Sequence, residues 1–393
     1  MSGRNTATQI LKTSGSSYAL PFHVPHRARR QAAYVAEALR HGHLRPDGPF
    51  FQRAQAWLAD HTAAERVVLT NSCTAALEIA ALALELGPGD DVIVPTFTFC
   101  ASATAFERTG ARIVFCDIDP ATMMIDPADL AHRLSDRTRV IVATHYGGGV
   151  ADMEAILALA RSRGIHVVED AAQGFGTLRN DRPLGTFGTF GAFSFHDTKV
   201  ASCGQGGALI VNTDDRKLLE LVTSIVERGT DFALVRSGKK AFYEWTSTGS
   251  SFQMGELEAA ILTAEFEALD ENLAARKRVA AALMRGMETL ALPIVPIHAD
   301  AQTVSNFHFM PVLTRSAREA KDLIASQRKR GIDCRQHYVP LHLSPRAKAM
   351  SYGHGALLEA ESTWDRLVRL PVHTAMDAYD VEMVLEGLKA WAG

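Results

Sequence analysis

Two charged side chains stand where apolar strands are expected to end, and their chemistry is complementary. Asp170 closes the apolar run of "VVEDAAQGFG" (167–176), and Lys199 lies in the Ser-, Thr- and Gly-rich turn "SFHDTKVASCGQGG" (194–207). A carboxylate at a buried strand end is costly unless a cation needs it. A lysine amine forms a Schiff base with an aldehyde, and a carboxylate keeps a pyridine nitrogen protonated. In one pocket the pair would suit pyridoxal 5'-phosphate (PLP); apart, Asp170 is a cap or ion-pair partner and Lys199 is simply exposed.

A phosphate needs backbone N–H donors at the start of a helix. The stretch "NSCTAALEIA" offers small and hydroxyl residues immediately before a strongly helical run. We expect Ser72, Cys73 and Thr74 to cradle a phosphate there, although Ser72 or Thr74 would also be a suitable helix cap. Ser194, just before the lysine turn, could add another hydroxyl or serve only the strand.

A flat pyridine ring also needs a face on which to stack. "PTFTF" (95–99) ends another apolar run and offers Phe97 and Phe99, although aromatic residues in such runs more often pack in the core. Gln173, three residues beyond Asp170, could donate to the phenolic oxygen of the cofactor or satisfy a loop.

The elements that must position these residues alternate between apolar runs and helical stretches over residues 70–215. The apolar runs are nearly continuous, which is typical of strands covered on both faces. We therefore predict an α/β fold with a mostly parallel sheet, whose ligands gather beyond the carboxyl ends of the strands. The connection from Phe195 to Gly206 is too short for a crossover helix, so the last two strands are predicted to be antiparallel. The predicted strands are 92–95, 112–118, 138–146, 165–170, 191–195 and 206–212.

Helical patterns and polar stretches suggest how the rest of the chain is divided. Helices are expected at 72–87, at 152–164 with Asp152 at its start, and at 215–229. A polar loop follows at 230–250, and one or two long amphipathic helices follow at 254–290. We predict a flexible N-terminal arm (1–20), a large PLP-binding domain (21–275) and a small C-terminal α/β domain (276–393).

Composition excludes several classes of protein. The chain has 393 residues, 47% of them hydrophobic, and a formal net charge of −3, which argues against a nucleic-acid partner. No apolar run approaches the roughly 20 residues that a membrane helix needs, and the N-terminus does not resemble a signal peptide. The five cysteines are widely spaced and form no zinc pattern, so we expect no metal and a reducing, cytoplasmic location.

Six segments together resemble the DegT/DnrJ/EryC1/StrS sugar aminotransferases. They are "NSCTAAL", "PTFTF", "VVEDAAQGFG", "FSFHDTK…GQGGALI", "GSSFQMGELEAA" and "YVPLHLSP", in order and at natural spacing from about residue 20 to the C-terminus. These are PLP enzymes of the type I, aspartate-aminotransferase-like fold that act on nucleotide-linked keto sugars. The branch that makes dTDP-4-amino-4,6-dideoxyhexoses is the most similar.

The resemblance implies a role for each matching residue around the cofactor. Lys199 would be the Schiff-base lysine and proton shuttle, Asp170 the partner of the pyridinium nitrogen, and Gln173 a contact of the cofactor O3. Phe99 would stack on the ring. The phosphate would be held by Cys73, Thr74 and Ser194.

The resemblance also implies a homodimer with shared active sites. The "GSSFQM" stretch matches a loop that reaches the neighbouring subunit's site, where an Asn commonly touches phosphate; here that position is Ser251. Gln205 in "GQGG" replaces the usual Glu. His337, Tyr338 and His342 fall where the family lines the sugar-nucleotide entrance, although each is individually more typical of a structural residue.

The implied reaction is amination of dTDP-4-keto-6-deoxy-D-glucose by L-glutamate, and we expect the gluco rather than the galacto product. Amination at position 3 is an alternative. PLP-dependent sugar dehydratases carry His in place of the lysine, so Lys199 argues against dehydration. An amino-acid lyase should show an arginine placed for an α-carboxylate, and the sequence assigns none. The non-enzymatic alternative is a regulator that binds cofactor or sugar without turnover.

Overall fold

The structure is a computed structural model that describes residues 17–297, 301–350 and 355–393. Within these residues seven strands form one sheet, in the order β1-β11-β10-β7-β6-β2-β3. β11 runs antiparallel to both of its neighbours, and the other pairings are parallel. The predictions of a mostly parallel sheet and of an antiparallel last pair are both confirmed. The strands are β1 (Arg66–Thr70), β2 (Asp91–Pro95), β3 (Arg112–Cys116), β6 (Thr138–Thr144), β7 (His166–Asp170), β10 (Phe190–Ser194) and β11 (Gly207–Val211).

Two strand predictions differ from the structure. β1 was not predicted, although its run "RVVLT" is as apolar as those of the strands that were. The run at 112–118 is broken after Cys116, and its end forms β4 (Ile118–Asp119), which pairs with β5 (Met124–Ile125). β4 and β5 form a two-stranded sheet of their own.

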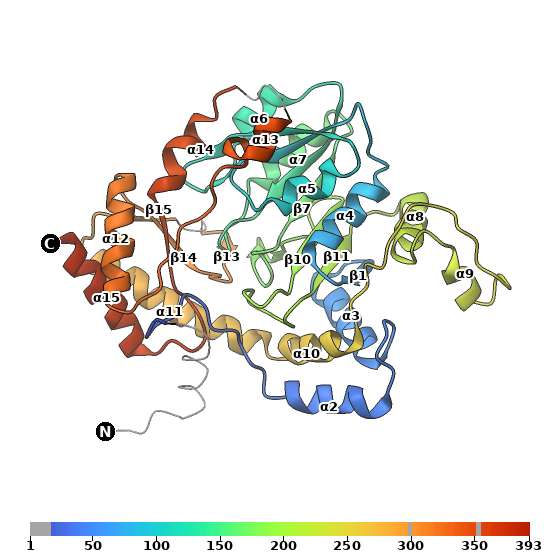
Figure 1. The fold of residues 1–393 in the computed structure, drawn as a ribbon, viewed down its shortest axis with the longest axis horizontal. Coiled ribbons are helices and arrows are strands. Elements are labelled where there is room, and N and C mark those ends of the chain that lie inside the picture. Colours follow the sequence, from blue (N-terminus) through green and yellow to red (C-terminus); the bar gives the residue numbers. More distant parts are fainter. Residues whose placement is uncertain (1–16, 298–300, 351–354) are drawn as a thin grey trace.

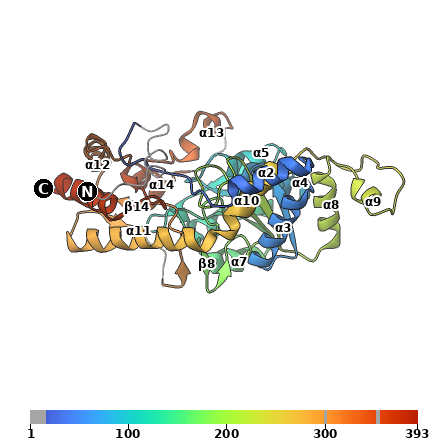
Figure 2. The same cartoon turned by 90° about the horizontal axis from the view of Figure 1, so that it is seen from below.

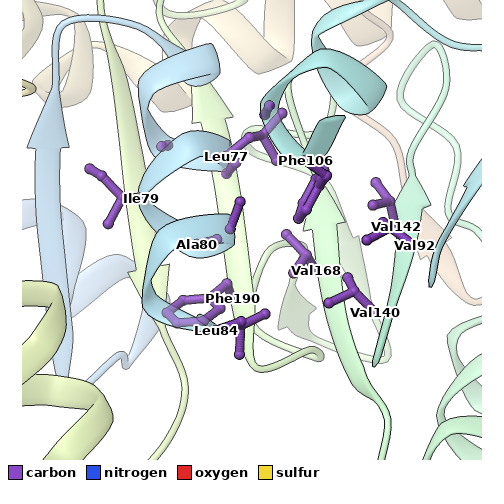
Figure 3. Packing of buried hydrophobic residues seen from close by; sticks show 14 of the residues in the cluster. Leu77, Ile79, Ala80, Leu84, Val92, Phe106, Val140, Val142, Val168 and Phe190 are labelled. Atoms are coloured by element: carbon purple, nitrogen blue, oxygen red, sulfur yellow. The ribbon is translucent and has the colours of Figure 1, made fainter. Parts of the chain in front are cut away.

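Helices cover both faces of the large sheet, as the continuous apolar runs predicted. In β6, Val140 and Val142 pack into a different core cluster from Ile141 and Ala143, since successive side chains point to opposite faces. Figure 3 shows the first of these clusters, where Leu77 and Phe106 meet Val168. One cluster includes residues of α4 (Cys73–Ala83), α5 (Ala101–Glu107) and α8 (Arg216–Val226). The helices packed with the opposite face are α2 (Gln31–His41), α3 (Pro49–Thr62), α6 (Pro127–Arg133), α7 (Met153–Arg161) and α10 (Glu256–Glu267).

A separate apolar cluster lies in the C-terminal part of the chain. It joins α11 (Leu269–Thr289) to α12 (Ala317–Lys329), α15 (Ala378–Ala392) and a small sheet. That sheet has the order β12 (Val295–Pro296), β14 (Met310–Leu313), β15 (Leu367–Leu370). Figure 1 shows these elements at one end of the molecule, with α11 running from them toward α10. The proposed boundary between residues 275 and 276 falls inside α11, and it stays a prediction.

The N-terminal residues that the structure describes lie against this C-terminal part. Leu20 is fully buried, donates its N–H to the Gly331 carbonyl and accepts a hydrogen bond from the Asp333 N–H. The proposed flexible arm was assigned to residues 1–20, and of these residues 1–16 lie outside the described ranges. Leu20 itself is an anchored core residue, so the arm cannot include it.

The region after β11 contains more helix than was predicted. The stretch 230–250, predicted to be a loop, contains α9 (Phe232–Arg236), and the segment 254–290 forms two helices separated at Ala268. Figures 1 and 2 both show α8 and α9 at the end of the molecule opposite α12 and α15. The remaining short elements are β8 (Leu178–Arg179), β9 (Arg182–Pro183), β13 (Thr303–Val304), η1 (Leu341–Leu343), α13 (Pro345–Ala349), α14 (Leu358–Thr363) and η2 (Trp364–Arg366).

The described residues contain neither a candidate membrane helix nor a candidate metal cluster. In these ranges no helix is long and apolar enough to cross a membrane. Nor does the described part of the chain bring together three or more His, Cys, Asp or Glu side chains that could hold a metal ion.

Candidate active site

The ends of three neighbouring strands, β6, β7 and β10, bring predicted residues to one edge of the large sheet. β7 ends at Asp170, which is in register with Thr144 at the end of β6 and with Ala192 in β10. β10 ends at Ser194, and the turn after it carries Lys199, whose N–H donates to the His196 carbonyl at 2.9 Å. Parallel strands place their carboxyl ends together, so residues distant in sequence converge here.

A cavity of about 470 Å³ lies at this edge, and it contains both residues of the proposed catalytic pair. Lys199 and Asp170 line the same cavity, as the PLP interpretation requires. The other predicted residues that line it are Ser72, Cys73, Thr74, Phe99, Gln173, Ser194, His337 and Tyr338. Gln205, which stands in place of the usual Glu, lies on its wall too.

The environment of Lys199 favours the neutral amine. Desolvation lowers the pKa of Lys199 below its ordinary value, and the positive charge of Arg369 acts in the same direction. The charge of Asp170 acts in the opposite direction, but burial has the larger effect. A lysine that must accept a proton near neutral pH needs this shift, because an ordinary lysine is almost fully protonated there.

Asp170 is held by hydrogen bonds that the sequence did not indicate. The carboxylate is buried, and its Oδ2 accepts a hydrogen bond from Ser102 Oγ at 2.5 Å while its Oδ1 accepts one from the Ala172 N–H at 3.1 Å. Ser102 Oγ lies 2.8 Å from Thr98 Oγ1, which lies 3.3 Å from Thr144 Oγ1. The Ser102 hydroxyl, itself held by Thr98, fixes the orientation of the carboxylate.

We expect Ser102→Ala to lower turnover about 10-fold, because a hydrogen bond to a charged group contributes roughly 1.5–3 kcal/mol. Thr104→Ala on the same helix is the matched control, since Thr104 is exposed and should tolerate the change. Steady-state rates and melting temperatures of both variants check this prediction. A Ser102→Ala enzyme with normal turnover and a lowered melting temperature would assign the serine a purely structural role.

The start of α4 has the form of a phosphate cradle. Ser72 is the N-cap, and its Oγ accepts a hydrogen bond from the Ala75 N–H at 3.1 Å. The N–H groups of Cys73 and Thr74 precede the point at which α-helical hydrogen bonding begins, so they are available to an anion. Gly207 lies against this turn, where a Cβ would be 2.4 Å from the Cys73 nitrogen. Glycine is therefore required at the start of β11, and the residues present fit a bound phosphate.

Gln173 and the two candidate phenylalanines have distinct positions. The Gln173 Oε1 accepts a hydrogen bond from the Gly147 N–H at 2.8 Å, and its Nε2 donates to the Tyr338 hydroxyl at 3.1 Å. The amide is thus fixed at the cavity wall with one hydrogen still available. Phe97 is buried in the core, whereas Phe99 is 56% exposed and lines the cavity. Phe99 is therefore the better placed of the two to meet a ring.

Two predicted residues do not line this cavity. His342 Nδ1 lies 2.6 Å from Thr96 Oγ1, and its Nε2 lies 3.2 Å from Glu361 Oε1. Both ring nitrogens are occupied, so this geometry does not favour the proposed contact at the entrance. Ser251 is exposed and its carbonyl accepts a hydrogen bond from Asn71 Nδ2 at 3.2 Å. Its proposed contact concerns a second subunit and stays a prediction.

Glu169, which belongs to β7 itself, forms a buried pair with His145 that the sequence did not indicate. Glu169 is fully buried and accepts hydrogen bonds from the N–H groups of Gly185 (2.8 Å), Phe187 (2.6 Å) and Gly188 (2.7 Å). Its Oε2 lies 3.0 Å from Nε2 of His145, which lines the cavity and accepts the Ala151 N–H through Nδ1. Since Nδ1 is an acceptor, Nε2 carries the proton. The pair fixes the His145 ring beside Asp170.

Two curated relatives cover nearly the whole chain. The spore coat polysaccharide biosynthesis protein SpsC of Bacillus subtilis is 32% identical over 377 residues, which cover 94% of this chain and 96% of that protein. The GDP-perosamine synthase of Caulobacter vibrioides is 30% identical over 365 residues, covering 90% and 93% of the two chains. Both similarities therefore extend over nearly the whole of each chain.

Solved structures agree with the described fold. The aminotransferase TlmJ from Streptoalloteichus hindustanus superposes with a TM-score of 0.86 at 30% identity, covering 94% of this chain and 98% of that one. A sugar aminotransferase named Spr1654 from Streptococcus pneumoniae, solved in its PMP form, gives a TM-score of 0.88 at 25% identity, covering 95% of this chain and 99% of that one. Residues 25–389 match one family description. The chain belongs to the DegT/DnrJ/EryC1/StrS aminotransferase family.

Proposed function

We propose that this chain is a PLP-dependent aminotransferase that aminates a nucleotide-linked keto sugar, with Lys199 and Asp170 as its catalytic residues. The observation that supports this most strongly is that both residues line one cavity with the start of α4. The sugar aminotransferase activity in this proposal is supported by the chain's membership of the DegT/DnrJ/EryC1/StrS aminotransferase family. The substrate we propose is dTDP-4-keto-6-deoxy-D-glucose, and the proposed amino donor is L-glutamate.

Each residue around the cavity has a separable task in this proposal. The phosphate would be held by the α4 amides with Thr74 and Ser194, the ring by Phe99, and O3 by Gln173. PLP, when bound, supplies an electron sink that stabilises negative charge on the reacting carbon. Lys199 would hold the cofactor covalently and, as a free amine, would carry a proton to and from the reacting carbon. Asp170, oriented by its hydrogen bond from Ser102, would keep the ring nitrogen protonated.

We also propose a homodimer in which Ser251 approaches the phosphate site of the partner subunit. The support for this is that Ser251 is exposed and does not line the cavity of its own chain. Equilibrium sedimentation of the full chain tests the assembly, and a single species of monomer mass would contradict it.

The substrate assignment makes a direct prediction. We expect the purified protein with dTDP-4-keto-6-deoxy-D-glucose and L-glutamate to form a dTDP-4-amino-4,6-dideoxyhexose and 2-oxoglutarate. In the gluco product the C4 proton is axial and shows two large couplings in the proton NMR spectrum, whereas the galacto product shows small ones. A relative is named GDP-perosamine synthase, so the matched arm supplies the GDP-linked 4-keto-6-deoxy sugar. Faster amination of the GDP sugar would overturn the dTDP assignment, and a 3-amino or 3-deoxy product would overturn the assigned chemistry.

A further inference from the structure

The turn that carries Lys199 is held from outside by two side chains from distant segments of the chain. His23 Nε2 donates a hydrogen bond to the carbonyl of Asp197, which lies two residues before the lysine, at 2.7 Å. Asn272 Nδ2 donates to the carbonyl of Val200, which follows the lysine directly, at 2.8 Å. The backbone on both sides of Lys199 is therefore fixed by donors that do not belong to the turn.

The turn has few backbone hydrogen bonds of its own near the lysine. Among the described residues, the segment 198–202 makes a single backbone–backbone hydrogen bond, from the Lys199 N–H to the His196 carbonyl at 2.9 Å. Other backbone bonds join the two arms at the base of the turn, such as that from the Cys203 N–H to the Phe195 carbonyl at 3.0 Å. A segment with so few internal bonds depends on side-chain contacts for a single conformation.

Asn272 belongs to α11 and is almost completely buried. While its Nδ2 donates to the Val200 carbonyl, its Oδ1 accepts a hydrogen bond from Arg276 Nε at 3.0 Å. The two ends of a side-chain amide have nearly the same shape, so hydrogen bonds decide which end faces which partner. Since a guanidinium can only donate, Arg276 attracts the amide oxygen and leaves the amide nitrogen facing the turn. Arg276 thus sets the orientation of the amide.

Arg276 is fully buried, and it makes no ion pair within residues 17–297, 301–350 and 355–393. Its Nη1 donates to the carbonyls of Val372, His308 and Phe307, at 2.9, 3.3 and 3.4 Å. These carbonyls belong to segments that flank β14 and β15 of the small sheet. Burial lowers the pKa of Arg276 to about 10, against the charge of Glu265, so the side chain is cationic at neutral pH. A buried charge without a counter-ion is strongly unfavourable, so overall stability does not explain this arginine.

The helix α11 places Asn272 and Arg276 on one face, because residues four apart in a helix are neighbours. Leu269, at the start of α11, packs in the same apolar cluster as Val200, whereas Leu283 packs in the C-terminal cluster. Figure 1 shows the helix running between these two parts of the molecule. One face of α11 therefore contacts both the lysine turn and the segments that flank the small sheet.

We propose that Asn272 and His23 are positioning residues for Lys199. Arg276 takes part by orienting the Asn272 amide. The proposal rests on the catalytic role of Lys199 proposed above. The lysine amine must reach both the cofactor aldehyde and the reacting carbon, and a proton moves between heavy atoms that are ~2.6–3.2 Å apart. A misplacement of about 1 Å lowers the rate of such a step roughly 100-fold.

The test compares Asn272→Asp and Asn272→Leu with a control, Thr263→Val, in the full chain. In Asn272→Asp the carboxylate still accepts from Arg276 and gives it a counter-ion, so the fold should persist, but no donor remains for the Val200 carbonyl. Asn272→Leu removes the donor without adding a charge near Lys199. Thr263 of α10 is equally buried and donates to the Ala259 carbonyl, so its replacement removes a buried hydrogen bond away from the turn.

Hydrogen exchange of the protein without cofactor reports directly on the turn. We expect the amides of residues 195–205 to exchange about 10-fold faster in both Asn272 variants, since one buried hydrogen bond contributes up to about this much. Exchange in the rest of the chain should be unchanged. Attachment of PLP to Lys199, followed by absorbance, should slow by roughly 10- to 100-fold. Thr263→Val should change either measurement by less than about 2-fold.

Two substitutions of His23 test the other side of the turn. His23→Leu removes the donor to the Asp197 carbonyl and should slow the attachment of PLP by about 10-fold. His23→Gln carries an amide nitrogen that can take the place of Nε2, so it should restore the rate to within about 2-fold of the wild type. Rescue by a donor, where an apolar side chain fails, identifies the hydrogen bond as the cause.

Several outcomes would overturn the proposal. One is a normal rate of PLP attachment in Asn272→Leu, whether or not the turn exchanges faster. Another is faster exchange over the whole chain with a lowered melting temperature, since Asn272 would then serve only the fold. If Asn272→Leu does not fold, Asn272→Asp decides by the same measurements. A wild-type protein that attaches PLP to Lys199 but transfers no amino group would refute the proposed function and leave the positioning of the lysine standing.

Discussion

Lys199→Ala is expected to abolish transamination, with a loss of at least ~10⁴-fold, because no other group at the site can both hold the cofactor covalently and carry the proton. Borohydride reduction followed by peptide mass spectrometry should find PLP on Lys199 in the wild-type protein and no PLP adduct in the variant. Lys199→Arg should be equally inactive, since a guanidinium stays protonated at neutral pH and is not nucleophilic.

Lys217→Ala is the matched control for this experiment. Lys217 is an exposed lysine of α8, and its removal should leave both the PLP adduct and the turnover unchanged. A wild-type protein that fails to bind PLP at saturating concentration would contradict the central assignment. A Lys199→Ala protein that still transaminates would contradict it equally.

Asp170→Asn is expected to retain PLP binding and to lose turnover by about 10²–10³-fold, as removal of a preorganised electrostatic contact usually does. The amide has nearly the same shape but no charge, so it can no longer favour a protonated ring nitrogen. It should still be able to bond to Ser102 and Ala172, so the fold should be preserved. Single-turnover rates of the donor half-reaction, together with melting curves, check this prediction.

Asp197→Asn supplies the control within the lysine turn. Asp197 is exposed and does not line the cavity, so its substitution should leave the rate within about 2-fold. If Asp170→Asn turned over at the wild-type rate, Asp170 would have no role in the electron sink. If both variants were equally slow, the effect would belong to the turn and not to the carboxylate.

For Asp170, the sequence indicated the need for a partner but not which residue would orient the carboxylate. That Asp170 needs a cationic partner was visible in the sequence, because an acidic residue closing an apolar run is a local contradiction. That Ser102 would be its hydrogen-bond donor was not visible. Ser102 lies 68 positions away in the chain, in a segment where serine and threonine are common, and only the packing of α5 against β7 selects it.

The sequence alone determined the mostly parallel sheet, the edge at which the site lies, and the residues of the proposed catalytic pair. Those features depend on local patterns: continuous apolar runs, small residues before a helix, and the rule that parallel strands end together. Only the tertiary structure decided that Glu169 supports His145 and that His342 contacts Thr96 and Glu361 instead of lining the cavity. Each of these depends on which side chains from distant segments meet in a buried space. A four-residue strand such as "LVRL" does not reveal which of its faces will meet the large domain.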